Sequence, residues 1–152
     1  MMNWAFDIAY RNRVILNSFL EKHTLQELNT VPEGFSNSII WNIAHVIVTQ
    51  QLLVYGLSNV KMLLTEQMIE RYRKGSKTEK DVTPEELEDI RALLFSTLEQ
   101  TKKDYANGVF KTFNSYTTST NSTMTNVDEA IQFNNFHEGI HLGYILAQRK
   151  SI

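Results

Sequence analysis

The sequence contains no cysteine in 152 residues, and only two prolines and six glycines. Without cysteine there is no disulfide framework, thiol nucleophile or iron–sulfur cluster, so a bound metal needs histidine or carboxylate ligands. Neither sign of charge is in large excess, because the chain has 15 Lys and Arg residues and 17 Asp and Glu residues, which give a formal net charge of −2. A chain without a basic excess gives no electrostatic reason to expect nucleic acid as a partner.

The sequence also gives no indication of a targeting segment or a membrane-spanning segment. The stretch from Met1 to Asp7 lacks the basic and then apolar layout of a signal peptide, and no apolar run suggests a membrane span. We therefore expect a cytoplasmic protein with no membrane partner. The hydrophobic share of 42% is near the globular average. The length suits a single domain over residues 1–152.

Hydrophobic periodicity predicts helices and no confident strand, so the predicted fold class is all-α. The predicted helices run from about Trp4 to Lys22, Ser38 to Leu57, Thr83 to Tyr105, and Asn126 almost to the C-terminus. The third begins with a capping box, Thr83-Pro84-Glu85-Glu86, and stops at Asn107-Gly108. Four helices near twenty residues each predict a four-helix bundle.

The distribution of apolar residues around the first two helices predicts which residues form the core and where a second chain could bind. In the first helix, two sets of apolar residues are expected to face the core, Trp4, Ile8, Ile15 and Phe19 together with Ala5, Ala9, Leu16 and Leu20. The second helix is apolar nearly all round, which predicts either a central position or a subunit contact, and hence a homodimer. The long stretch from Ser58 to Val82 permits a crossover, so an up-down-up-down order is not forced.

Three of the four histidines fall on apolar helix faces. His45 shares a stripe with Trp41 on the second helix, while His137 and His141 lie one turn apart on the fourth. Two imidazoles at i and i+4 can offer nitrogen ligands to one metal. For a lone histidine, a core residue bonded to a backbone carbonyl is the default, but three without a shared partner would leave several nitrogens unsatisfied. We therefore predict a divalent metal held by His45, His137 and His141.

Two other interpretations concern the remaining histidine and Glu138. His23 stands at the end of the first helix, where a structural role is expected. The string from His137 to His141 matches the H-E-x-x-H pattern of zinc peptidases, in which the glutamate is the general base. No downstream Asp, Glu or His supplies a third ligand, and Glu138 is expected to reach solvent or a neighbouring chain. The peptidase interpretation is therefore disfavoured.

Residues near the histidines are candidates for supporting roles. Asn42 and Asn134 each precede a histidine by three residues and are candidate partners of the rings, although local bonding or exposure to water is equally expected. Trp41 and Tyr144 are candidate pocket walls, with plain core residues as the alternative. The basic segment from Arg71 to Lys80 is either a solvated loop or a surface that steers an anionic substrate.

The residues Ser38-Ile39-Ile40-Trp41-Asn42-Ile43-Ala44-His45, with His137-x-x-x-His141 near the C-terminus, resemble the DinB-like superfamily. The resemblance spans nearly the whole chain, and within the superfamily the sequence is similar to the damage-inducible and bacillithiol-transferase-related members. It implies an up-down-down-up four-helix bundle, a divalent metal on His45, His137 and His141, and frequent homodimers. It also implies reactions that use low-molecular-weight thiols, although many members have no established reaction.

The predicted function is a metal-dependent enzyme, either a thiol-dependent S-transferase or a hydrolase of small molecules. Three neutral imidazoles leave coordination positions for water or substrate. Zinc, nickel, iron and manganese all accept such ligands. The competing hypothesis is a non-catalytic metal- or ligand-binding protein of a stress response, and a cavity that opens the site to solvent distinguishes the enzyme from it.

Overall fold

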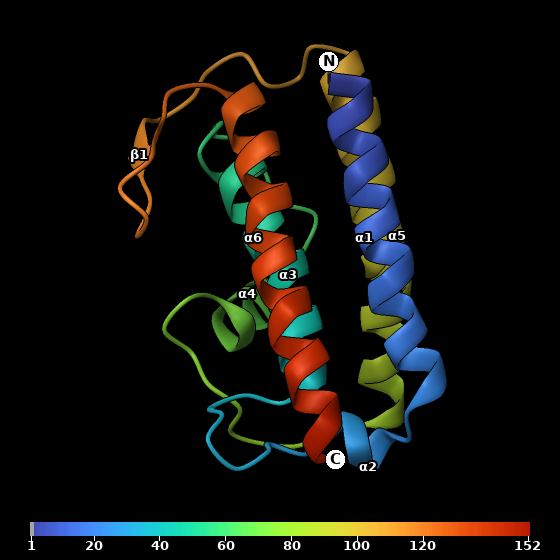
Figure 1. Cartoon of the computed structure of the whole chain (residues 1–152). Helices are drawn as coiled ribbons and strands as arrows, with labels where there is room; N and C mark the ends of the chain where they lie inside the picture. The colour runs from blue at the N-terminus through green and yellow to red at the C-terminus, as the bar shows by residue number, and fades with distance from the viewer. Residues whose placement is uncertain (1) are drawn as a thin grey trace.

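The computed structural model describes residues 2–152, and these residues are mostly helical (Figure 1). The elements in chain order are α1 (Met2–Lys22), α2 (Leu25–Asn29), α3 (Ile39–Gln51), the π-helical turn η1 (Leu52–Gly56), α4 (Glu66–Tyr72), α5 (Pro84–Ala106), β1 (Tyr116–Thr117), β2 (Thr123–Met124), α6 (Val127–Gln148) and the 3₁₀ turn η2 (Arg149–Ser151). The predicted all-α class is confirmed. The predicted long helices correspond to α1, α3 with η1, α5 and α6.

The long helices pack side by side. Helix α1 packs against α5 and α6, and α3 packs against the same two helices. In Figure 1, α1 and α6 run downward, whereas α3 and α5 run upward. The short helix α4 packs against α3 and lies beside the middle part of α3 in the same view. Helix α3 therefore has long helices on two sides and α4 on a third.

Side-chain caps explain where the long helices begin and end. The side chains of Ser38, Thr83 and Asn126 accept hydrogen bonds from backbone amides in the first turns of α3, α5 and α6. The capping box predicted at Thr83 is present, with Glu86 returning a bond to the Thr83 amide. After α5, Gly108 has a φ of +68°, which lets the chain leave the helix as predicted.

Helix α3 lies in the centre of the fold and is not left exposed at its surface. Every residue from Ile39 to Gln51 is buried except Thr49. The span Ile39–Gly56 is long and apolar enough to cross a membrane by composition, contrary to the sequence-based reading, and 83% of it is buried inside the protein, as in a core helix. The argument that α3 needs a second subunit to cover it is therefore wrong. The homodimer itself stays a prediction.

The buried face of α1 is narrower than the pattern predicts. Trp4 is 68% exposed and Ile15 is 42% exposed, so neither belongs to the core. The second predicted set is buried, and Arg13 takes a place on the same stripe. The stripe that contains Arg13 packs toward α6, where the guanidinium forms a buried salt bridge with Glu138.

Three features were not predicted from the sequence. Helix α4 lies within the segment from Ser58 to Val82, capped by the Thr65 side chain. The turn η1 interrupts the α-helical pattern after Gln51. The polar stretch after residue 116 forms a small antiparallel hairpin that pairs Tyr116 with Met124.

Candidate metal centre

The histidines predicted as ligands come together from α3 and α6. His45, His137 and His141 form a group whose candidate ligand atoms all lie within 4.8 Å of one another. The Nε2 atoms of His45 and His137 are 3.2 Å apart. His45 is buried, and the other two are partly buried. The three side chains could hold one metal ion.

The ring of His45 is fixed by contacts on two sides. Its Nδ1–H donates to the backbone carbonyl of Tyr72 at 2.6 Å, so Nε2 carries the free lone pair. The indole of Trp41 stacks on the imidazole, with centroids 4.7 Å apart and planes at 12°. The Thr49 hydroxyl lies 3.3 Å from the same Nε2. Helix α4 therefore sets the tautomer of His45 through a backbone group, and α3 sets the plane of its ring.

The ring of His141 is oriented by Asn42. The Asn42 amide nitrogen donates to the Ser38 carbonyl, which leaves its oxygen to accept a bond of 2.8 Å from Nδ1–H of His141. The Asn42 amide nitrogen also lies 3.4 Å from Oε1 of Gln148, whose amide in turn donates to the Asn37 carbonyl. Asn42 thus acts as the predicted partner of a ring. The ring that it orients is that of His141 on α6, not that of His45 on its own helix.

The spacing of the nitrogens fits a cation. Zinc–nitrogen bonds of about 2.0–2.1 Å at tetrahedral angles place two nitrogens roughly 3.3–3.4 Å apart. The 3.2 Å between His45 and His137 is close to this value. The Nδ1 atom of His137 is buried and has no hydrogen-bond partner among residues 2–152. The polar contact of that ring in the structure is therefore through Nε2, to His45.

Burial keeps the imidazoles neutral. Desolvation lowers the pKa of His137 to about 3, with repulsion from His141 and His45 adding to the effect. Burial and the nearby His45 lower the pKa of His141 to about 3 as well. Burial also lowers the pKa of His45, against an opposing contribution from the Tyr72 carbonyl. Neutral imidazoles with free lone pairs are the form that binds a divalent metal.

The cluster lies in a cavity of about 990 Å³. Its lining includes the three histidines, Trp41 and Tyr144, together with residues of η1, the loop before α3 and the hairpin. Trp41 is only 6% exposed and belongs to the main core, so it is both a core residue and a cavity wall. Tyr144 is 51% exposed and is not a core residue. The cavity thus connects the histidines to the surface.

The stripe of α6 that carries the histidines faces this cavity rather than the packed core. The buried residues of α6 are Ala130, Ile131, Asn134, Glu138, Ile145 and Gln148. Ile140, an apolar residue next to His141, is 39% exposed. The buried stripe and the histidine stripe are therefore different faces of one helix.

Glu138 is on the buried face, contrary to the expectation that it reaches solvent or another chain. It is 0% exposed, and its Oε1 accepts bonds from Nε and Nη2 of Arg13 at 2.9 and 2.7 Å. Asn134 donates to the same oxygen at 3.0 Å rather than to a histidine ring. Glu138 does not line the cavity, so it is not placed as the general base of a zinc peptidase.

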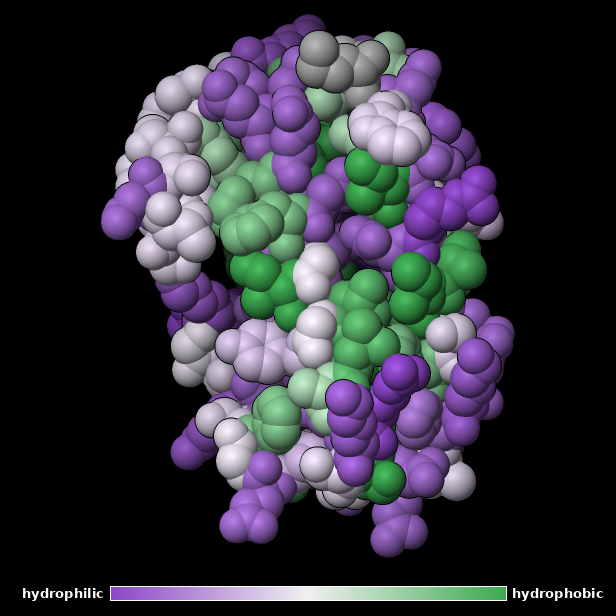
Figure 2. All heavy atoms as spheres, viewed as in Figure 1, coloured by the Kyte–Doolittle hydropathy of each residue, from purple (hydrophilic) through white to green (hydrophobic). Residues whose placement is uncertain are grey.

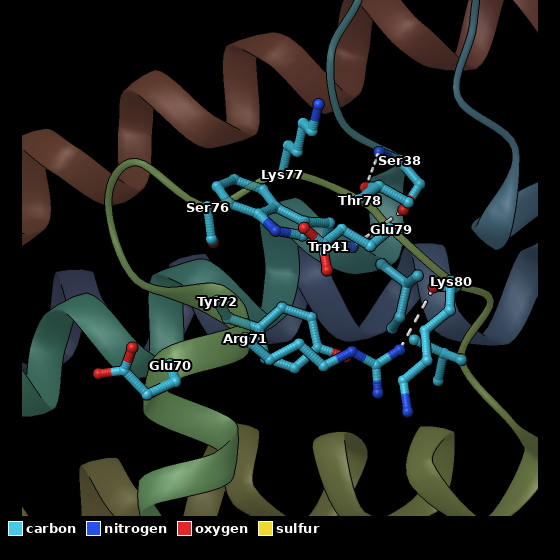
Figure 3. A pocket seen from close by; sticks show the side chains of 12 residues that line it. Ser38, Trp41, Glu70, Arg71, Tyr72, Ser76, Lys77, Thr78, Glu79 and Lys80 are labelled. Atoms are coloured by element: carbon cyan, nitrogen blue, oxygen red, sulfur yellow. Dashed lines mark hydrogen bonds between the residues drawn. The ribbon is translucent and has the colours of Figure 1, made fainter.

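Trp41 also lines a smaller cavity of about 350 Å³ (Figure 3). Much of its wall is the predicted basic segment, in which Arg71 pairs with Glu86 at 2.7 Å. Glu70 and Glu79 line this cavity beside Lys77 and Lys80. This cavity therefore presents charge of both signs.

His23 stays apart from the cluster, as predicted. Its Nδ1–H donates to the Phe19 carbonyl at 3.0 Å near the end of α1, and the two rings stack. Thr49 and the Tyr72 carbonyl are the site groups that the sequence reading missed. Thr49 follows His45 by four residues, a spacing that places it on the same face. The carbonyl leaves no mark in the sequence.

Comparisons with known proteins agree with the fold. The model of the DinB superfamily matches residues 9–145. A crystal structure of a conserved protein from Enterococcus faecalis superimposes with a TM-score of 0.69 at 16% identity, covering 100% of this chain and 96% of that one. No curated protein matches the sequence. The family match spans most of the chain, including all three clustered histidines, and the protein belongs to the DinB superfamily.

Proposed function

We propose that the protein is a metal-dependent enzyme that acts on small molecules, with one divalent cation held by His45, His137 and His141. The observation that carries this proposal is the convergence of three neutral imidazoles in a cavity of about 990 Å³ that reaches the surface. Catalytic metal sites have this form, with three protein ligands and a position left for another group. Zinc, nickel, iron and manganese are the candidate ions.

The chemistry of such a site divides between the cation and the chain. A cation held by neutral ligands acts as a Lewis acid and favours the ionised form of water or a thiol at neutral pH. The Tyr72 carbonyl and Asn42 hold the rings of His45 and His141 with Nε2 free. The Thr49 hydroxyl lies 3.3 Å from Nε2 of His45, where it can hold a polar atom of a substrate.

We favour a thiol-dependent S-transferase over a hydrolase. The support is the resemblance to superfamily members that use low-molecular-weight thiols, together with the lack of Asp or Glu in the cavity lining within residues 2–152. Ionising a thiol needs no separate carboxylate base once a cation is bound. The proposal includes a small-molecule substrate and a cytoplasmic homodimer, as the sequence predicts.

We also infer the up-down-down-up order of a four-helix bundle. The directions of the long helices in Figure 1 and the packing of α1 and α3 against the same two helices support it. In this arrangement α3 and α6 are neighbours that run in opposite directions. His45 of α3 then meets the histidine pair of α6 near the middle of both helices.

The test is a reaction screen of the metal-loaded protein. The chain is loaded separately with zinc, nickel, iron and manganese and incubated with low-molecular-weight thiols and electrophilic acceptors. We expect turnover that disappears in His137→Ala and is unchanged in His23→Ala. Stoichiometric metal binding without turnover of any thiol and acceptor in the screen would favour the alternative, a non-catalytic metal- or ligand-binding protein.

A further inference from the structure

Apolar side chains form a large part of the wall of the cavity around the histidines. Those from η1, the residue after it and α6 are Leu52, Leu53, Leu57, Phe133, Phe136 and Ile140. Phe136 is 54% exposed and Ile140 is 39% exposed, although both are apolar. Figure 2 shows hydrophobic surface gathered on the face that α6 presents. Apolar surface of this extent, next to a polar cluster, is typical of a ligand cavity.

The charge of the cavity is one-sided. Among residues 2–152, its lining contains one lysine, Lys74, and no Asp or Glu. The three imidazoles carry no charge to offset a bound dication, so the full charge of the ion acts on the cavity. The smaller cavity differs in this respect, because Glu70 and Glu79 contribute to its wall. Of these two cavities, the large one has no carboxylate in its lining within residues 2–152, so a dication held there would attract an anion.

We propose that the large cavity takes an organic anion with an apolar body, its anionic group directed at the histidine cluster and its apolar body between η1 and α6. This inference rests on the proposed metal site and names its substrate class. The volume of about 990 Å³ is at the upper end of cavities that enclose a ligand of drug size, which measure about 300–1,000 Å³. Thr118, Ser119 and Thr120 of the hairpin line the same cavity and can bind polar groups of the ligand.

The size of the expected effect follows from the apolar walls. Each buried methylene contributes about 0.8 kcal/mol, which corresponds to an affinity gain of roughly fourfold. Octanoate has the carboxylate of acetate and a longer hydrocarbon chain. Even if only half of the six added methylenes are buried, octanoate should bind about 60-fold more tightly than acetate. A site without apolar selection gives the same affinity for both.

The experiment uses the full chain loaded with cobalt, whose visible spectrum reports the binding of an anion to the ion. Acetate, butyrate and octanoate are titrated at constant pH and ionic strength, with octyltrimethylammonium as a cation of similar length. We expect affinity to rise with chain length and the cation to bind weakly. Phe136→Ser should reduce the affinity for octanoate and leave that for acetate unchanged. Trp4→Ser is the matched control, because Trp4 is 68% exposed and lies outside the cavity.

Each contrary result has a distinct meaning. Equal affinities for acetate and octanoate would overturn the substrate class and leave the metal site intact. Equally tight binding of octyltrimethylammonium would overturn the anionic part of the proposal. A dimer in sedimentation that excludes octanoate would assign this face to a second copy of the chain and overturn the proposal. A wild-type chain that binds neither zinc nor cobalt would overturn the proposed function together with this inference.

Discussion

The ion pair between Arg13 and Glu138 joins α1 to α6 directly behind the histidine pair. Both side chains are 0% exposed. Glu138 accepts two hydrogen bonds from Arg13 and one from Asn134, and Arg13 also donates to the Leu94 carbonyl of α5 at 2.9 Å. Replacing Glu138 by leucine removes three bonds and leaves a buried cation without its partner.

The cost of Glu138→Leu can be estimated from these contacts. Breaking a buried ion pair by removing one partner costs about 3–5 kcal/mol, because the remaining charge stays desolvated. For a domain of this length, each kcal/mol lowers Tm by about 2–4 °C, so Tm should fall by roughly 6–20 °C. Removing both charges in Arg13→Met with Glu138→Leu should restore much of the loss, since a matched apolar pair carries no desolvation penalty.

The assay is equilibrium unfolding in urea of the metal-free wild type, both single variants and the double variant. Metal content is measured on the same samples. The ion pair lies outside the cavity, so we expect folded Glu138→Leu to bind metal with the wild-type stoichiometry. A loss below about 1 kcal/mol in Glu138→Leu would refute the reasoning. So would a double variant whose loss equals the sum of the two single losses.

Two further predictions concern the histidine environment. Asn42→Ala should weaken metal affinity by about 10–100-fold, because the hydrogen bond that orients His141 is lost. Asn134→Ala should change stability and leave metal affinity near the wild-type value, because Asn134 bonds to Glu138 and not to a histidine. Competition with a chelator measures both affinities, and equal metal affinities in the two variants would contradict the assignment. The metal-free protein should lose stability as the pH falls from about 6.5 toward 3, since the pKa values of His137 and His141 are lowered to about 3 in the folded state and the unfolded chain takes up protons first. Thermal unfolding across this range should give a flatter profile in His137→Gln than in the wild type, and parallel profiles would contradict the shift.

Much of the fold was predictable from local patterns. The helix starts at Thr83 and Asn126 are encoded by a side chain and its partner three residues later, so they can be read without knowledge of packing. The gathering of three histidines was also predictable, because helical periodicity places each on an apolar face. What periodicity could not distinguish is a packed core from an apolar cavity, since both require the same residue types.

The remaining features depend on contacts distant in sequence. Arg13 and Glu138 are 125 residues apart, and neither one alone indicates a buried ion pair. Trp4 and Ile15 are exposed because the packing of α1 against α5 and α6 covers a different side of the helix, and that packing has no local sequence signature. The Tyr72 carbonyl meets His45 only because α4 packs on α3, and a backbone group has no sequence signature.

Metal analysis of single histidine variants tests the central claim most directly. Each purified variant is saturated with zinc, freed of excess metal and analysed for bound ion, with circular dichroism as a check that the helices remain. We predict one ion per chain in the wild type and in His23→Ala, and none or nearly none in His45→Ala, His137→Ala and His141→Ala. Full stoichiometric binding that survives in His45→Ala would contradict the three-histidine site.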